Sequence, residues 1–177
     1  MILPKLSGNT LSSEEKWFVL YTAPRAEKVV YKHLIEQQYK AYLPISRNVS
    51  IWKNRQKKII EKPLFASYVF TKTLERELYN ITKVPKVVTY LRNGSRPSTI
   101  AEHEIEQIRT MTTTGSPLTI EPTLIVGEKV RITEGPFLGY EGILQRRNGK
   151  SCFGIQLTDL NQTIFVELEN CNLERLS

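Results

Sequence analysis

The sequence has few of the side chains from which metal and disulfide sites are built. Its 177 residues include two cysteines and two histidines. They are Cys152, Cys171, His33 and His103, and none of them form the close pairs that zinc sites use. We therefore expect no metal and no cofactor. With no secretion signal recognisable in the sequence, we expect two reduced thiols rather than a disulfide.

Long apolar runs and hydrolase motifs are also missing. The longest apolar runs are far too short to cross a bilayer, and residues 1–15 contain no apolar stretch of signal-peptide length. The sequence contains neither G-x-S-x-G nor H-E-x-x-H. We expect a monomeric cytoplasmic protein that has no enzymatic activity and does not act at a membrane.

Positive charge is concentrated in one part of the sequence. The formal net charge is +7, from 25 basic and 18 acidic residues. Residues 25–62 contain ten Lys or Arg against three Glu, which accounts for the whole excess. Clustered cations favour a polyanionic partner, because they release condensed counterions from nucleic acid. The alternative is a solvated basic face with no partner.

Hydrophobic periodicity divides the chain into two kinds of structure. The first part alternates strands with amphipathic helices, beginning with the apolar strand KWFVLYT, and includes a hairpin with a basic tip. The last part contains about five short strands between turns, which must close into a barrel to bury a core. We predict an α+β protein in which a mixed αβ sandwich is linked to a small all-β barrel. The expected bounds are a leader at 1–13, the αβ domain at 14–113, a linker at 114–123 and the barrel at 124–177.

The stretch EGPFLGYEG, residues 134–142, is rich in glycine. A phosphate-binding loop requires G-x-x-x-x-G-K-[ST], but here Gly139 is followed by Tyr140 and Glu141. We therefore exclude a nucleotide site. We expect Gly139 to supply a positive φ in a turn and Gly142 to allow two backbones to approach closely.

In this setting VRITEGPFLGYEGIL resembles the KOW motif. Four more segments, KWFVLYT, KPLFASYVF, VPKVVTYL and RPSTI, extend the resemblance in family order. Together they resemble the NusG family of transcription elongation factors, which includes the RfaH and UpxY antitermination paralogues. Many housekeeping members have Pro-Gly where this chain has Ala66 and Ser67, and the segments KPLFASYVF and LYT look closer to the UpxY-like group. The resemblance implies an NGN domain, a KOW barrel and a role in antitermination, with polysaccharide operons as targets.

Four aromatic residues on or beside the predicted central strands form the first candidate site. The family resemblance places them in a surface pocket that receives the β′ clamp helices of RNA polymerase, and buried aromatic anchors are typical of such contacts. The alternative is that each ring fills core. Phe65 and Tyr68 are three residues apart, so a bulge or strand end near Ala66 must bring them together; otherwise one of them is core. The four residues are Tyr21, Phe65, Tyr68 and Phe70.

Basic residues at the hairpin tip and on the first helix form the second candidate site. Beside a polymerase-docking surface they would lie near upstream DNA or the nontemplate strand, and phosphate contact is the expected mode. Trp52 adds the hypothesis of base stacking. The residues are Arg25, Lys28, Lys53, Arg55, Lys57 and Lys58.

Leu160, in the TDLNQT loop of the barrel, is the third candidate. The family resemblance implies that an apolar residue here helps to engage Rho or a small-subunit ribosomal protein, whereas an ordinary turn residue is the alternative. KOW motifs also occur in ribosomal proteins, so a ribosome-associated protein that binds RNA is the alternative function.

Overall fold

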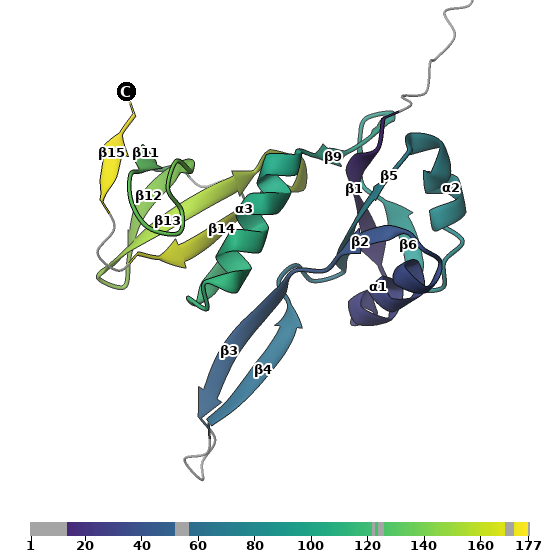
Figure 1. Cartoon of the computed structure of the whole chain (residues 1–177), viewed down its shortest axis with the longest axis horizontal. Coiled ribbons are helices and arrows are strands. Elements are labelled where there is room, and N and C mark those ends of the chain that lie inside the picture. The colour runs from purple at the N-terminus through teal and green to yellow at the C-terminus, as the bar shows by residue number, and fades with distance from the viewer. Residues whose placement is uncertain (1–13, 52–56, 122, 124–125, 169–171, 177) are drawn as a thin grey trace, which may run out of the picture.

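The structure is a computed structural model of the chain, and it describes residues 14–51, 57–121, 123, 126–168 and 172–176. An N-terminal sheet flanked by helices is followed by an all-β part, as Figure 1 shows. This arrangement confirms the predicted fold class. No helix within the described ranges is long and apolar enough to span a bilayer.

An antiparallel sheet forms the centre of the N-terminal part. Its strand order is β2-β5-β1-β6, and β9 also pairs with β1. The helical elements are α1 (Glu27–Glu36), the 3-10 turn η1 (Glu75–Glu77), α2 (Leu78–Ile81) and α3 (Glu102–Thr113). The strands are β1 (Lys16–Thr22), β2 (Lys40–Tyr42), β5 (Tyr68–Thr73), β6 (Val87–Tyr90) and β9 (Thr99–Ile100), with a small hairpin of β7 (Arg92–Asn93) and β8 (Arg96–Pro97).

Alternating side chains of β1 face two different apolar clusters, because successive residues of a strand point to opposite faces of the sheet. Trp17 and Val19 pack in the cluster that contains the buried residues of α3. Leu20 packs on the other face with Val30 and Leu34 of α1. The sheet therefore has α3 on one face and α1 on the other. The helical spacing in the sequence correctly predicted that Ile105, Ile108 and Met111 of α3 point inward.

A long hairpin projects away from the rest of the molecule (Figure 1). It consists of β3 (Ile45–Ile51) and β4 (Lys57–Pro63), which pair from Ile45 with Pro63 to Ile51 with Lys57. The prediction of a hairpin in this region is confirmed. The residues between its two strands, 52–56, are outside the described part of the chain.

The C-terminal part, called the barrel below, is a six-stranded antiparallel sheet in the order β10-β14-β13-β12-β11-β15. β10 lies within the region that we expected to be a linker, and it pairs with β14 along its whole length. Only residues 114–117 separate the end of α3 from β10. The strands are β10 (Leu118–Glu121), β11 (Glu128–Ile132), β12 (Glu141–Arg147), β13 (Lys150–Leu157), β14 (Gln162–Glu167) and β15 (Leu173–Arg175), and the 3-10 turn η2 (Thr158–Leu160) joins β13 to β14.

The two predicted glycine roles, one in the turn before β12 and one within β12, are confirmed. Gly139 has a φ of +80°, a conformation that residues with side chains rarely adopt. A Cβ atom added to Gly142 would lie 2.3 Å from the carbonyl oxygen of Gly154. The glycines therefore serve the backbone geometry of the barrel.

Helix α3 lies between the N-terminal sheet and the barrel (Figure 1). One continuous apolar cluster contains Ile108 of α3, Phe70 of the sheet and Phe153 of the barrel. Thr110 of α3 also lies within hydrogen-bonding distance of Tyr140 in the barrel, with 2.9 Å between the two oxygens. The barrel is therefore docked on α3 in this conformation.

Candidate binding surface

The structure brings the four predicted aromatic residues, here called the aromatic surface, to the α3 side of the sheet. Tyr21 of β1 is paired with Tyr68 of β5, and their ring centroids are 6.0 Å apart in an edge-to-face arrangement. Two residues along each strand, Val19 is paired with Phe70. Phe65 and Phe70 contact each other with centroids 5.6 Å apart.

Phe65 reaches this side because it precedes β5 in a tight turn. Ser67, between Phe65 and Tyr68, has a φ of +63°. The amide of Tyr68 donates to the carbonyl oxygen of Phe65 at 3.5 Å. This turn at the start of β5 is the strand end that we expected to bring Phe65 and Tyr68 together.

Members of the aromatic surface differ sharply in exposure. Tyr21 is 38 % exposed and Tyr68 is half-buried, whereas Phe65 is 1 % exposed and Phe70 is fully buried. The expectation that all four residues line a surface pocket is therefore wrong for Phe65 in this conformation, because Phe65 packs in the cluster shared by the sheet, α3 and the barrel. The tyrosine pair is the part of the aromatic surface that a partner can reach.

Helix α3 contacts the sheet beside the aromatic surface through Tyr42 of β2. Arg109 stacks over the ring of Tyr42, 4.4 Å from its centroid, and Tyr42 also contacts the Thr112 hydroxyl at 3.5 Å. Burial raises the pKa of the Tyr42 phenol above its ordinary value, although the hydrogen bond with Thr112 opposes this shift. Tyr42 is therefore a neutral ring at physiological pH, and it packs against Phe70 of the aromatic surface with ring centroids 6.2 Å apart.

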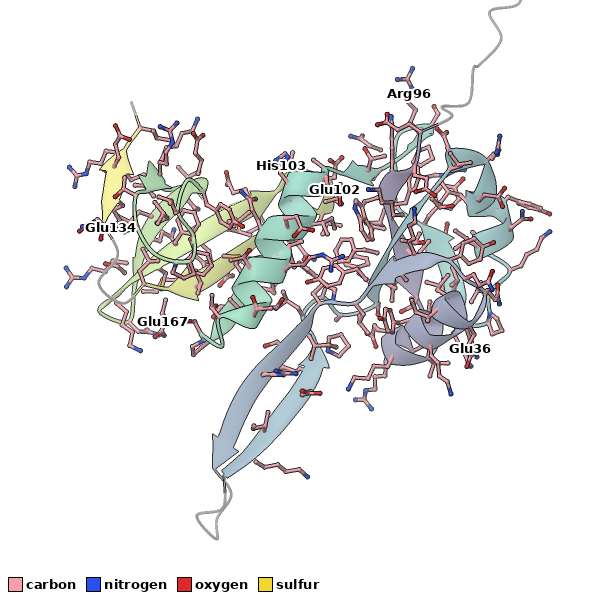
Figure 2. The ribbon with its side chains drawn as sticks, viewed as in Figure 1. Glu36, Arg96, Glu102, His103, Glu134 and Glu167 are labelled. Atoms are coloured by element: carbon pink, nitrogen blue, oxygen red, sulfur yellow. The ribbon has the colours of Figure 1, made fainter. Side chains whose placement is uncertain are left out.

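Glu102 lies in the first turn of α3, at the end of the helix beside the sheet, and is labelled in Figure 2. Its carboxylate accepts hydrogen bonds from Lys72 at 2.6 Å and from the indole nitrogen of Trp17 at 3.0 Å. Lys72 chiefly, and then Trp17, lower the pKa of the Glu102 carboxyl. The sequence showed no signal for this contact, because the three residues are far apart along the chain.

The predicted basic residues are only partly within the described chain. Lys53 and Arg55 lie outside it, as does Trp52, and Lys57 begins β4. Lys58 and Arg25 are exposed. The structure thus leaves the tip of the predicted basic surface undescribed.

The base of the hairpin is joined to α1 by charged side chains. Lys28 of α1 donates to the carbonyl oxygen of Glu61 in β4 at 3.4 Å. The Glu61 carboxylate in turn pairs with Arg47 of β3 at 2.8 Å. These contacts place Lys28 of α1 beside the base of the hairpin.

Leu160 is not an exposed loop residue in this structure. It ends η2 and is 7 % exposed within the same apolar cluster as α3 and the barrel core. Its neighbour Asp159 lines a cavity together with Glu102 and Glu104 of α3. The predicted partner site of the barrel therefore faces the N-terminal part.

A larger cavity of about 960 Å³ lies between α3 and the barrel. Its walls include His103 and Gln107 of α3 and Tyr140 and Ile155 of the barrel. Within the described ranges, no three His, Cys, Asp or Glu side chains gather closely enough to hold a metal ion. Cys152 is a buried free thiol whose pKa is raised by burial, and Cys171 lies outside the described residues.

The part of the chain that carries the aromatic surface matches a known protein family. The family model NusG, described as transcription termination factor nusG, matches residues 15–109, which is more than half of the chain. The chain belongs to the NusG family. Proteins of the NusG family are transcription factors rather than enzymes.

Curated members of the NusG family resemble most of the chain. A transcription termination/antitermination protein NusG from Campylobacter jejuni is 29 % identical over 75 % of this chain and 81 % of its own length. The protein of the same name from Pseudomonas aeruginosa is 25 % identical over 92 % of this chain and 99 % of its own. The similarity therefore extends beyond the N-terminal part.

A solved structure agrees in fold. It is described as domain interaction in Thermotoga maritima NusG, and it matches 93 % of this chain and 98 % of its own with a TM-score of 0.58 and 20 % identity. The two-part architecture is thus that of a NusG protein.

Proposed function

We propose that this NusG-family protein is a transcription elongation and antitermination factor that binds the β′ clamp helices of RNA polymerase through its aromatic surface. Tyr21 and Tyr68 are the accessible anchors, and Phe65 and Phe70 support them from beneath. Polysaccharide biosynthesis operons are the proposed targets. The observation that carries the proposal is a paired, partly exposed tyrosine cluster on a domain whose sequence matches the NusG model.

The physical basis is a helix-in-groove contact. Tyrosine presents a large rigid apolar ring with a polar tip, so it binds a helix at a low cost in conformational entropy. By linkage, the factor suppresses pausing only to the extent that it binds the processive polymerase more tightly than the paused one. A difference of about 1.4 kcal/mol shifts that equilibrium tenfold.

Replacing Tyr21 or Tyr68 with Ala tests this contact. Each change should weaken binding of the full-length protein to RNA polymerase by roughly thirtyfold, or about 2 kcal/mol, as expected for interface hot spots. Tyr79→Ala is the matched control, because Tyr79 is an exposed tyrosine on α2. Equal affinities for all three variants in a binding titration would remove the clamp contact from this surface.

DNA is the second proposed partner, through the hairpin and α1. Replacing Lys53, Arg55, Lys57 and Lys58 with Ser should weaken binding to the DNA of an elongation complex. The slope of log affinity against log salt should flatten by roughly 0.7 to 0.9 for each phosphate that the variant no longer neutralises. An unchanged slope would show that these cations are only solvated.

The barrel is proposed to recruit a second factor, either Rho or a small-subunit ribosomal protein, through the loop around Leu160. Leu160 is buried while the barrel is docked, so recruitment by this loop requires a rearrangement that exposes it. The variant Leu160→Glu is therefore a poor test, since it places a carboxylate in an apolar cluster and destabilises the fold. Asp159→Lys, which changes the adjacent side chain on the cavity wall, is the better probe of recruitment.

Co-purification separates this proposal from the ribosomal alternative. A tagged full-length protein should retain RNA polymerase from a cell lysate. Retention of ribosomal subunits without polymerase would instead favour an RNA-binding KOW protein of the ribosome. The match of the NusG model to residues 15–109, outside the KOW motif, supports the transcriptional role.

A further inference from the structure

A buried carboxylate holds the turn that carries the aromatic surface. Glu27, the first residue of α1, is only 6 % exposed. Its Oε1 accepts a hydrogen bond from the backbone amide of Ser67 at 2.6 Å. The carbonyl oxygen of Ser67 accepts another from the amide of Thr22 at 2.8 Å. The Ser67 residue is thus held on both sides, by the helix and by the central strand.

This turn needs such support because its backbone is unfavourable for serine. Ser67 occupies the third position of a four-residue turn from Phe65 to Tyr68, and its φ of +63° is one that glycine adopts readily and serine rarely. Without Glu27, the Ser67 amide would lose its acceptor at a partly buried site, which is unfavourable for a backbone donor. In the absence of Glu27, both effects would favour a different backbone conformation of the turn.

The turn also fixes the position of the aromatic rings. Phe65 is its first residue, and Tyr68, its last, begins β5 opposite Tyr21. The edge-to-face contact between Tyr21 and Tyr68 depends on where the turn places the Tyr68 ring. A change of φ at Ser67 would rotate the chain immediately before Tyr68.

We propose that Glu27 is a positioning residue for the aromatic surface, whose carboxylate holds Ser67 in the left-handed conformation and so sets the Tyr68 ring against Tyr21. The expected effect of Glu27 on polymerase binding rests on the proposed function. Glu27 itself touches no partner, because it is buried beneath the turn.

The test uses full-length protein carrying Glu27→Ala, alone and combined with Ser67→Gly. Glycine adopts the left-handed conformation without a steric penalty, so the second change should restore the turn in the absence of Glu27. Glu36→Ala is the matched control, since it removes an exposed glutamate from the last turn of the same helix (Figure 2). Two quantities are measured: the NMR cross-peaks between the Tyr21 and Tyr68 rings, and the affinity for RNA polymerase.

Glu27→Ala should remove the ring cross-peaks and weaken polymerase binding at least tenfold, while methyl signals of the opposite cluster around Ile81 and Val84 persist. Adding Ser67→Gly should recover the cross-peaks and most of the affinity. Glu36→Ala should resemble the wild type. A loss of affinity that Ser67→Gly does not reverse would show a merely structural role and overturn the proposal.

Unchanged ring cross-peaks in Glu27→Ala would also overturn it. If that variant fails to fold, Glu27→Gln takes its place. Glutamine keeps an acceptor oxygen, but a neutral acceptor forms a weaker hydrogen bond with the Ser67 amide than a carboxylate does, so the ring contact should be partly weakened and Ser67→Gly should restore it. If the wild-type protein does not bind polymerase, the proposed function fails, and the NMR measurements alone decide the role of Glu27.

Discussion

The Thr110 hydroxyl of α3 lies 2.9 Å from the phenol oxygen of Tyr140 in the barrel. The same hydroxyl donates to the carbonyl oxygen of Glu106 at 3.0 Å. A hydroxyl has one proton to donate, so Tyr140 is the donor to Thr110. This bond joins two parts of the protein that only four residues, 114–117, connect before β10.

Tyr140→Phe should loosen the docking of the barrel on α3. The change removes the donor and keeps the ring, so it should weaken docking by about 1 kcal/mol and raise the undocked population roughly fivefold. Measurements of ¹⁵N relaxation report whether the two parts tumble together. Tyr79→Phe removes the same atom from an exposed ring and serves as the control. Identical relaxation in both variants would mean that the Tyr140 hydroxyl contributes nothing to docking.

Phe65→Ala should strongly destabilise the protein. Phe65 is among the fully buried side chains, and truncating a buried phenylalanine costs about 3 to 5 kcal/mol of unfolding free energy. Tyr21→Ala should cost much less, because its side chain is partly exposed. Urea denaturation of the two variants provides the comparison. Equal stability losses would contradict the distinction between supporting phenylalanines and accessible tyrosines.

Glu102 should make stability depend on pH at the acidic end. Its carboxyl pKa is lowered in the folded protein, chiefly by Lys72. The stabilisation is therefore fully present above the pKa of an unfolded glutamate, about 4.3, and is lost as pH falls through the lower folded-state pKa. Glu102→Gln should reduce stability at pH 7 by no more than about 1 kcal/mol, since the pair is largely exposed.

Thermal melting at pH 7 and pH 3 measures this effect. The difference between Glu102→Gln and the wild type should shrink at pH 3, because this pH lies below the pKa of an unfolded glutamate, about 4.3, where the stabilisation is no longer fully present. If the stability difference between the two proteins grows as the pH falls, the hydrogen bonds from Lys72 and Trp17 are not what lowers the pKa of Glu102.

Gly142→Ala should disrupt the barrel by steric overlap. The new methyl group would lie 2.3 Å from the Gly154 carbonyl oxygen and 2.7 Å from the Phe153 ring, so we expect a loss of about 3 kcal/mol. Gly149→Ala meets no atom within 4 Å but has a φ of +80°, and it should cost about 1 kcal/mol. Denaturation curves should therefore rank Gly142→Ala as the more damaging change.

Several features of the fold were predictable from local pattern. The apolar run of KWFVLYT, the helical spacing of Ile105, Ile108 and Met111, and the glycines of EGPFLGYEG each indicated structure that the protein has. Five segments in family order also pointed to the NusG family, to which the chain belongs. These signals are local because periodicity and backbone conformation depend on residues close together in the chain.

The linker shows where local pattern was insufficient. Residues 118–121 lack a strong strand signal, yet they form β10 because β14 offers its free edge to them. A short segment of low hydrophobicity acquires its structure from the partner strand, which the local sequence does not reveal.

By itself, the sequence determined the two-part organisation, the family and the choice of aromatic and basic residues for the candidate surfaces, because residue type and spacing can be read directly from the chain. The tertiary structure decided which of those residues are accessible. It buried Phe65 and Leu160, left Tyr21 partly exposed and placed Glu27 against the turn at Ser67. Burial depends on which distant segments pack over a side chain, and α3 and the barrel meet these residues only after the chain has folded.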